Sequence, residues 1–248
     1  MMVALPKVTV IAHRGWSAKY PENTLLAFRE AIALGADGIE FDVHQSKNGQ
    51  LVVIHDADVS RTTNGTGQVS TLTLDALWAL DAGRGERIPT LREVLELGRG
   101  KVVFHLEIKA PGIEEKVVTL MDDVGVMDTT YFSSFSHTSM ARIKALRPTA
   151  KVATLESAVA VDSETKQTRL ANQFVKHAQK VNAMAVHINY VNATPIIINT
   201  LHAAKLRVNI WTVDSEILAG ELAKMGVDGF FTNRLDIVLN FLKKAPVK

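Results

Sequence analysis

The chain has 248 residues and no cysteine, and its 28 basic and 26 acidic residues leave a formal net charge of +2. This balance, without a basic stripe, argues against a nucleic-acid partner, and the lack of cysteine excludes disulfides and thiolate metal sites. Hydrophobic residues make up 47% and charged residues 22%, as in ordinary globular proteins. Residues 1–15 show no signal-peptide pattern and no apolar run approaches membrane-spanning length, so we expect a cytoplasmic protein without membrane insertion.

In chain order, short runs rich in β-formers alternate with segments of helical period. The predicted strands are residues 8–12, 38–43, 101–109, 130–135, 151–155, 183–188, 206–213 and 226–231. The predicted helices are residues 24–35, 91–98, 113–125, 137–147, 164–181, 195–204, 215–225 and 235–243. Strands that are each followed by a helix predict a parallel (β/α)8 TIM barrel, which at this length is favoured over an open doubly wound sheet.

The second repeat is interrupted by a segment far longer than a typical βα loop. This segment holds a further strand, a Gly/Thr-rich loop and a short helix, predicted at residues 51–56, 61–67 and 73–80. Long insertions at the carboxyl ends of barrel strands are usually functional. No linker divides the sequence, so we predict one domain over residues 1–248, with an insertion at about 44–90.

Two of the predicted strands carry acidic residues at alternate positions. Glu40 and Asp42 share one face of their strand, and Glu107 and Lys109 share one face of another, because side chains two residues apart point the same way. Burying several carboxylates together is costly unless a cation neutralises them. The pattern therefore favours a divalent metal site with oxygen ligands, and an inner salt-bridge network built on Lys109 is the alternative.

His55 lies near the end of the predicted strand at residues 51–56, the next strand after Glu40 and Asp42. Asn48 and Gly49 form a favoured two-residue hairpin turn, and this register would pair Asp42 directly with His55. The histidine would then lie beside the proposed metal ligands. The alternative is an exposed hairpin histidine that pairs with Asp56, and a single bulge would decide between the two.

His13 and Arg14 end the first predicted strand, at the barrel face where βα loops build active sites. Arginine binds phosphate or carboxylate in a bidentate manner, and two histidines near a cation suit phosphoryl chemistry, one as base and one as acid. A strand-end pair bonded to loop carbonyls is equally compatible with the pattern. Trp211, at a strand end, suits a substrate wall or core packing.

The remaining histidines are weaker candidates. We expect surface positions for His44, His137, His177 and His202, and structural positions in the barrel interior for His105 and His187.

The sequence closely resembles the glycerophosphodiester phosphodiesterase family, especially its compact bacterial cytoplasmic type. The resemblance spans nearly the whole chain. It is carried by "AHRG" (12–15), "PENT" (21–24), "GADGIEFDVHQSKNGQLVVIHD" (35–56), "RTTNGTG" (61–67), "IPTLREVL" (88–95), "LEIK" (106–109), "WTVD" (211–214) and "GVDGFFTN" (226–233). The family often has Asn where this chain has Asp214, a position that touches no expected ligand or catalyst.

The resemblance implies a TIM barrel with a small insertion after the second strand, and hydrolysis of a glycerophosphodiester to glycerol 3-phosphate and an alcohol such as choline or ethanolamine. The neighbouring glycerol hydroxyl would attack first, and water would open the cyclic phosphate. The implied residues are the catalytic pair His13 and His55, the metal ligands Glu40, Asp42 and Glu107 for Mg²⁺ or Ca²⁺, and the substrate-binding residues Arg14, Lys109 and Trp211.

Other functions stay open at this point. A related barrel could stop at the cyclic phosphate by lyase chemistry, and a non-catalytic binder of phosphorylated glycerol compounds would need no acid/base pair. The small-molecule substrate is the expected partner, and a homodimer would be unsurprising.

Overall fold

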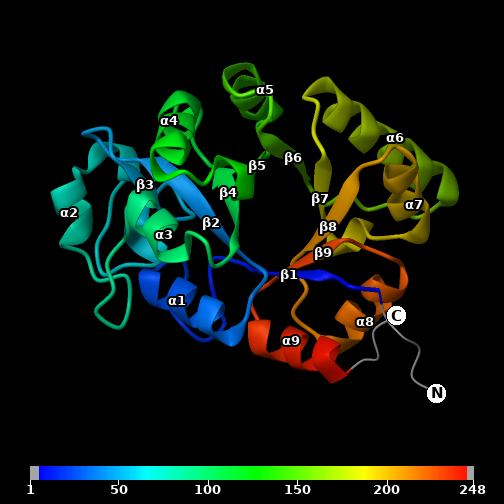
Figure 1. Ribbon diagram of the computed structural model, residues 1–248, viewed down its shortest axis with the longest axis horizontal. Helices are drawn as coiled ribbons and strands as arrows, with labels where there is room; N and C mark the ends of the chain where they lie inside the picture. Colours follow the sequence, from blue (N-terminus) through cyan, green and yellow to red (C-terminus); the bar gives the residue numbers. More distant parts are fainter. Residues whose placement is uncertain (1–5, 245–248) are drawn as a thin grey trace.

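The computed structural model describes residues 6–244, and its centre is a closed ring of parallel strands (Figure 1). The sheet order is β1-β9-β8-β7-β6-β5-β4-β2-β3, and an additional β1–β2 pairing closes it. All pairings are parallel except that of β2 with β3. Without β3, eight of the nine strands form the barrel, so the predicted (β/α)8 fold is confirmed.

The strands are β1 Thr9–Ala12, β2 Gly38–Gln45, β3 Leu51–Val53, β4 Val103–Ile108, β5 Thr130–Ser134, β6 Lys151–Glu156, β7 Ala185–Asn189, β8 Arg207–Trp211 and β9 Gly229–Thr232. The helices are α1 Leu25–Leu34, α2 Leu74–Trp78, α3 Leu91–Gly98, α4 Glu114–Val124, α5 His137–Leu146, α6 Glu164–Lys180, α7 Pro195–Ala203, α8 Glu216–Lys224 and α9 Leu235–Lys244. Every predicted element is present, with ends shifted by a few residues. No helix within residues 6–244 is long and apolar enough to cross a membrane.

Five of the described barrel helices, α1, α3, α6, α7 and α8, begin at a side-chain cap. Thr90, for example, accepts a hydrogen bond from the backbone of Glu93, whose side chain bonds back to Thr90, a reciprocal capping box that fixes the start of α3. A capped helix start holds the preceding loop in place, and here that loop closes the insertion.

The apolar faces of the strands pack outward against the ring of helices. Ile39, Phe41 and Val43 of β2 are fully buried in the main hydrophobic core. Phe41 contacts Phe28 of α1 and Phe104 of β4 edge-to-face, with ring centroids 5.9 and 6.0 Å apart. The alternate residues of β2, which include Glu40 and Asp42, are thereby turned into the barrel.

The insertion lies between β2 and α3, on the outside of β2 (Figure 1). It contains β3, two short 3₁₀ helices at Val59–Arg61 and Val69–Thr71, and α2. Its own small apolar cluster, separate from the main core, consists of Val52, Ile54, Val59, Val69, Leu77 and Ile88. The placement of one domain over all of residues 1–248 stays a prediction, because 1–5 and 245–248 lie outside the described residues.

Candidate active site

A cavity opens at the carboxyl ends of the barrel strands, the face where barrel enzymes build active sites. Seven of the eight residues predicted for the site line it; the eighth, Asp42, lies close to Glu40 and Glu107 and is 1% exposed. The seven are His13, Arg14, Glu40, His55, Glu107, Lys109 and Trp211. The structure therefore brings together residues that the sequence separates by almost two hundred positions.

The turn after β1 explains why a strand ends on His13 and Arg14. Arg14 has φ 56° and Gly15 has φ 80°, so the chain reverses within two residues of the strand end. A Cβ on Gly15 would lie 2.7 Å from the Cβ of Ala27, so only glycine permits α1 to pack this closely. The turn points the Arg14 backbone N–H at the Oε2 atom of Glu40, at 2.9 Å, and the arginine side chain stays at the cavity mouth.

Glu40, Asp42 and Glu107 form a compact cluster of carboxylates, each with an oxygen atom within 4.8 Å of the other two. Burial, followed by the repulsion of Asp42, raises the pKa of Glu107 to about 7 and holds the pKa of Glu40 well above its ordinary value. Three buried acids that repel one another fit a hard divalent cation, which takes oxygen ligands and lets all three ionise.

Lys109 neutralises this cluster only in part. Its Nζ atom donates to Glu107 at 2.9 Å and lies 3.7 Å from Asp42. Burial alone would lower the pKa of Lys109, but Glu107 and then Asp42 raise it, so the lysine stays charged. The predicted salt-bridge network is therefore present, and it is compatible with a cation at the same cluster, since one lysine does not balance three carboxylates.

The raised pKa of Glu107 makes the stability of the metal-free protein depend on pH. Its pKa rises from 4.5 to about 7 in the folded protein, so between these values the folded state holds a proton that the unfolded chain has released. Stability conferred by this proton is lost as the pH rises through that window. With EDTA present, we expect the Tm of the wild type to fall relative to that of Glu107→Gln as the pH rises.

The control for this experiment is Glu96→Gln, which removes a carboxylate that is 59% exposed on α3. The difference in Tm between Glu96→Gln and the wild type should stay constant over the same pH range. A constant difference in Tm between the wild type and Glu107→Gln over the same pH range would contradict the account.

His13 is held in one orientation by an amide. Its Nδ1 atom lies 2.7 Å from Oδ1 of Asn233, while Nδ2 of Asn233 donates to Asp214 at 2.8 Å. Because a carboxylate only accepts, the amide orientation is set, and Nδ1 of His13 must be the donor. Nε2 then carries the free lone pair, 3.9 Å from Glu40. Burial, followed by the Arg14 guanidinium, lowers the pKa of His13 to about 4.

The predicted hairpin register is wrong by one residue, so Asp42 does not pair with His55. The Ser46 N–H donates to the Gln50 carbonyl at 2.9 Å, which closes a loop of three residues, and the Ile54 N–H donates to the Asp42 carbonyl at 3.0 Å. Asp42 therefore lies opposite Ile54. A hairpin loop with one more residue shifts every pair beyond it.

His55 nevertheless reaches the cavity, from beyond the end of β3. Its carbonyl oxygen is 3.1 Å from Nε2 of His44, a residue expected at the surface but only 8% exposed. Its Nδ1 atom lies 2.5 Å from Asp56, and its Nε2 atom lies 3.1 Å from Nζ of Lys109. His55 therefore pairs with Asp56, as in the second interpretation, but it is half-buried rather than exposed and lines the cavity together with Glu40 and Glu107.

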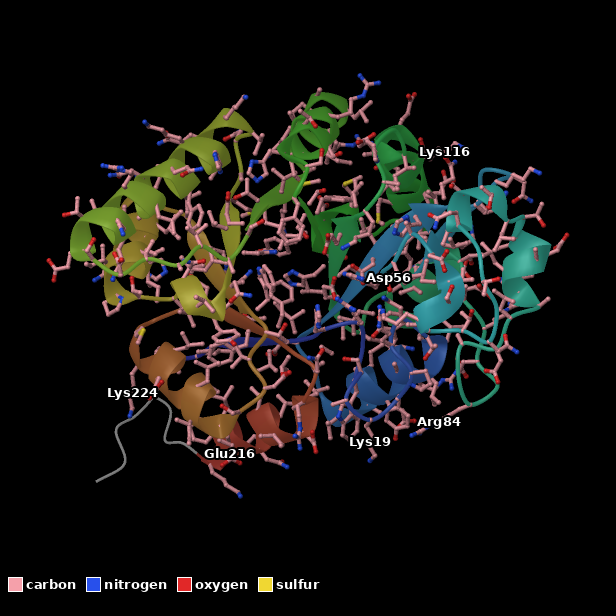
Figure 2. All side chains as sticks on the ribbon, turned by 180° about the vertical axis from the view of Figure 1, so that it is seen from behind. Lys19, Asp56, Arg84, Lys116, Glu216 and Lys224 are labelled. Carbon is pink, nitrogen blue, oxygen red and sulfur yellow. The ribbon has the colours of Figure 1, made fainter. Side chains whose placement is uncertain are left out.

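Asp56 belongs to a chain of ion pairs that joins the two sides of the cavity mouth. Arg61 donates to Asp56 at 2.5 Å and, through both terminal nitrogens, to Glu22 at 3.0 and 2.8 Å. Glu22 also accepts from Arg14 at 2.9 Å. The hydrogen bond from Arg61 holds the pKa of Asp56 well below its ordinary range. In Figure 2 Asp56 lies inward of the outer helices, whereas Lys116 lies at the periphery.

Trp211 ends β8 and forms an apolar wall of the cavity. Its ring meets Phe135, the residue after β5, edge-to-face with centroids 6.0 Å apart. Phe135 is 47% exposed, so the wall continues to the surface. An apolar wall opposite a charged cluster suits a ligand with one polar and one less polar end.

His105 and His187 lie in the barrel interior, as expected. His105 stacks on Tyr131 at 5.1 Å between centroids, and Nε2 of His187 accepts from Asn209 at 3.1 Å. Burial lowers the pKa of His187 to about 3 and that of His105 well below its usual value, so both are neutral. Both are therefore uncharged, and His187 also lines the cavity.

Several residues that support the site have no role that local sequence patterns predict. Glu22 bridges two arginines, Asn23 donates to Asp42 at 2.8 Å, and Asn233 orients His13. They lie in the "PENT" and "GVDGFFTN" segments, which marked them as part of a motif without revealing which side chains they would meet. Asp214 contacts no predicted catalyst or ligand, as expected, but it orients Asn233.

The sequence matches a known protein family over nearly its whole length. A family model described as the glycerophosphoryl diester phosphodiesterase family matches residues 13–237. A glycerophosphodiester phosphodiesterase from Caldanaerobacter subterraneus subsp. tengcongensis is 38% identical over 252 residues, which cover 96% of this chain and 99% of that protein.

Solved structures give the same result. A phosphodiesterase from Oleispira antarctica, in complex with the product sn-glycerol-3-phosphate, superposes with a TM-score of 0.83 at 29% identity and covers 97% of this chain and 98% of its own. A glycerophosphodiester phosphodiesterase from Agrobacterium tumefaciens gives a TM-score of 0.81 at 28% identity, covering 94% and 100%. This chain therefore belongs to the glycerophosphoryl diester phosphodiesterase family and is a phosphoric diester hydrolase.

Proposed function

We propose that the protein hydrolyses glycerophosphodiesters, such as glycerophosphocholine or glycerophosphoethanolamine, to glycerol 3-phosphate and an alcohol. The reaction depends on a divalent cation, Mg²⁺ or Ca²⁺, and on His13 and His55 as an acid/base pair. The observation that carries the proposal is the convergence of both imidazoles, a carboxylate cluster and Arg14 on one cavity. The product bound to the Oleispira antarctica phosphodiesterase supports glycerol 3-phosphate as the product here.

The two histidines differ in the hydrogen-bond partner of their Nδ1 atoms, and this difference suggests their roles. Nδ1 of His55 is bonded to the carboxylate of Asp56, which stabilises an imidazolium, whereas Nδ1 of His13 is bonded to the neutral amide of Asn233. His13 then removes the proton from the attacking glycerol hydroxyl, and His55 protonates the departing alcohol. The roles reverse when water opens the cyclic phosphate.

Cationic groups of the protein and a bound divalent cation would both stabilise the negative charge of the phosphoryl group. Arg14 lines the cavity mouth with a guanidinium that stays charged, and Lys109 adds a second cationic donor near His55. A divalent cation held by Glu40, Asp42 and Glu107 would supply Lewis-acid stabilisation of the developing negative charge. Trp211 would cover the less polar end of the substrate.

Phosphorus NMR of the reaction with glycerophosphocholine tests this function. Glycerol 3-phosphate should accumulate, with the cyclic phosphate appearing only transiently. Accumulation of the cyclic phosphate as the end product would instead indicate a lyase, and tight binding without turnover in any divalent ion would indicate a binding protein.

Asp56→Asn should lower kcat about 10- to 100-fold, by analogy with the loss of a carboxylate that orients a metal-bound histidine. Asparagine keeps the hydrogen bond to His55 but neither stabilises an imidazolium nor pairs with Arg61. Steady-state kinetics with glycerophosphocholine measure the effect. The matched control is Asp58→Asn, in the same loop, where the carboxylate bonds only Ser60 and Gln68 among its described side-chain partners. Equal kinetics for the two variants would exclude the role given to Asp56.

Two further proposals rest on the sequence. A cytoplasmic location is supported by the absence of cysteine, and a homodimer is tested by sedimentation at working concentration.

A further inference from the structure

A second group of side chains that could hold a metal ion lies outside the cavity. Two of its three residues come from α5 and α6, which follow each other in the outer ring of helices (Figure 1). His137 is the first residue of α5, Glu156 is the last residue of β6, and His177 lies in the last turn of α6. None of the three lines the cavity described above. Three elements far apart in sequence thus place two imidazoles and one carboxylate together.

The spacing of the three groups matches a metal coordination shell. Nε2 of His137 lies 3.5 Å from Oε1 of Glu156, and Nδ1 of His177 lies 3.2 Å from the same oxygen. Ligands at 2.0–2.1 Å from a tetrahedral zinc ion are about 3.3–3.4 Å from one another. One ligand atom from each residue lies within 4.8 Å of the other two, so a small contraction would close the shell.

The surroundings also suit a bound cation. The side chain of Glu156 is 6% exposed, so its carboxylate is enclosed and faces both imidazoles, while His137 and His177 keep 23% and 32% of their side chains exposed. Solvent can therefore reach the group from the histidine side. Nε2 of His137 is 3.3 Å from the Leu155 carbonyl, which is longer than the usual N–H···O distance. A metal ion could therefore replace this weak hydrogen bond at Nε2.

We propose that His137, Glu156 and His177 bind a zinc ion, or a transition-metal ion of similar preference, at a site separate from the catalytic carboxylates. Two imidazole nitrogens with one carboxylate favour such ions over Mg²⁺ or Ca²⁺, which prefer oxygen ligands throughout. Water would complete the shell on the exposed side. The ion would clamp α5 and α6 onto the end of β6, so it stabilises the fold and does not take part in hydrolysis. The proposal is independent of the function proposed above.

Zinc titration in excess Mg²⁺ tests the proposal, because excess Mg²⁺ would compete with zinc for the three carboxylates of the cavity. We expect one equivalent of Zn²⁺ to bind by calorimetry and to raise the Tm, and we expect Co²⁺ to give the visible absorption of a site with nitrogen ligands. His137→Gln and His177→Gln should each lose the bound equivalent and the rise in Tm. Circular dichroism without zinc shows whether each variant is folded.

The matched control is His202→Gln, which breaks a histidine–carboxylate pair of 3.0 Å with Asp228 that is not part of a three-ligand group among the described residues. This variant should bind zinc as the wild type does. Absence of zinc binding by the wild type, or zinc binding unchanged in both His137→Gln and His177→Gln, would overturn the proposal. X-ray absorption of the zinc complex of Asp42→Asn, whose catalytic carboxylates are disrupted, should show imidazole ligands, and a shell of oxygen alone would also overturn it.

Discussion

Replacing His13 or His55 by alanine should each lower kcat for glycerophosphocholine by about 10²–10⁴-fold, the usual contribution of a general acid or base. Each ring is held by its Nδ1 atom, by Asn233 at 2.7 Å and by Asp56 at 2.5 Å, so each presents Nε2 to the cavity. Neither histidine is an expected ligand of the cation, which the carboxylates of Glu40, Asp42 and Glu107 should hold. Turnover should therefore fall while the affinity for the cation changes little.

A substrate with a better leaving group separates the two roles. A glycerophospho-p-nitrophenyl ester releases an alcohol that needs little protonation, so His55→Ala should lose less activity on it than on glycerophosphocholine. His13→Ala should lose similar activity on both. His202→Ala is the control, because His202 pairs with Asp228 and does not line the cavity. Near-wild-type turnover in either His13→Ala or His55→Ala would show that this histidine is not part of the acid/base pair.

Removal of the cation should have a comparable or larger effect, a loss of about 10³-fold or more. Lewis-acid stabilisation contributes several kcal/mol, and each 1.36 kcal/mol is tenfold in rate. EDTA should abolish glycerol 3-phosphate release by the wild type, and Mg²⁺ or Ca²⁺ should restore it. In Asp42→Asn the same cations should restore little, because Asp42 is 1% exposed at the centre of the carboxylate cluster.

A coupled assay that quantifies glycerol 3-phosphate measures this loss directly, with metal-free buffers and a cation titration for both proteins. Full turnover of the wild type after exhaustive chelation would contradict the metal dependence. Equal restoration of the wild type and Asp42→Asn would remove Asp42 from the ligand set.

The fold and the inner carboxylates could be predicted because strand periodicity is short and local. Glu40 and Asp42 alternate with Ile39, Phe41 and Val43, and the three apolar residues are fully buried in the outer core. Because side chains alternate along a strand, only two orientations of its faces are possible, and burial of the apolar face decides between them.

The position of His55 could not be derived in the same way, because hairpin register depends on the loop. Asn48 and Gly49 suit a two-residue turn, but Gly49, at φ 83°, also suits the three-residue loop that the structure has. In that loop the Ser46 side chain donates to Asn48 and accepts from the Gln50 backbone. These side-chain bonds favour the longer loop and shift the register.

Contacts between distant segments were also beyond prediction. His137 and His177 fall at loop or helix positions that are typical of surface residues, and both stay partly exposed, but no local pattern predicts that both lie near Glu156 at the end of β6. Asn233 meets His13 across 220 positions in the sequence. Such partners depend on how the barrel closes, which no local pattern encodes.

A crystal structure of the wild type with Mg²⁺ or Ca²⁺ and glycerol 3-phosphate tests the central claim most directly. We expect the cation within about 2.0–2.6 Å of oxygen atoms of Glu40, Asp42 and Glu107, the range of these ions with oxygen ligands. The phosphate should lie between Nε2 of His13 and Nε2 of His55 and contact Arg14. A phosphate bound elsewhere, or a cation that contacts none of the three carboxylates, would contradict the account.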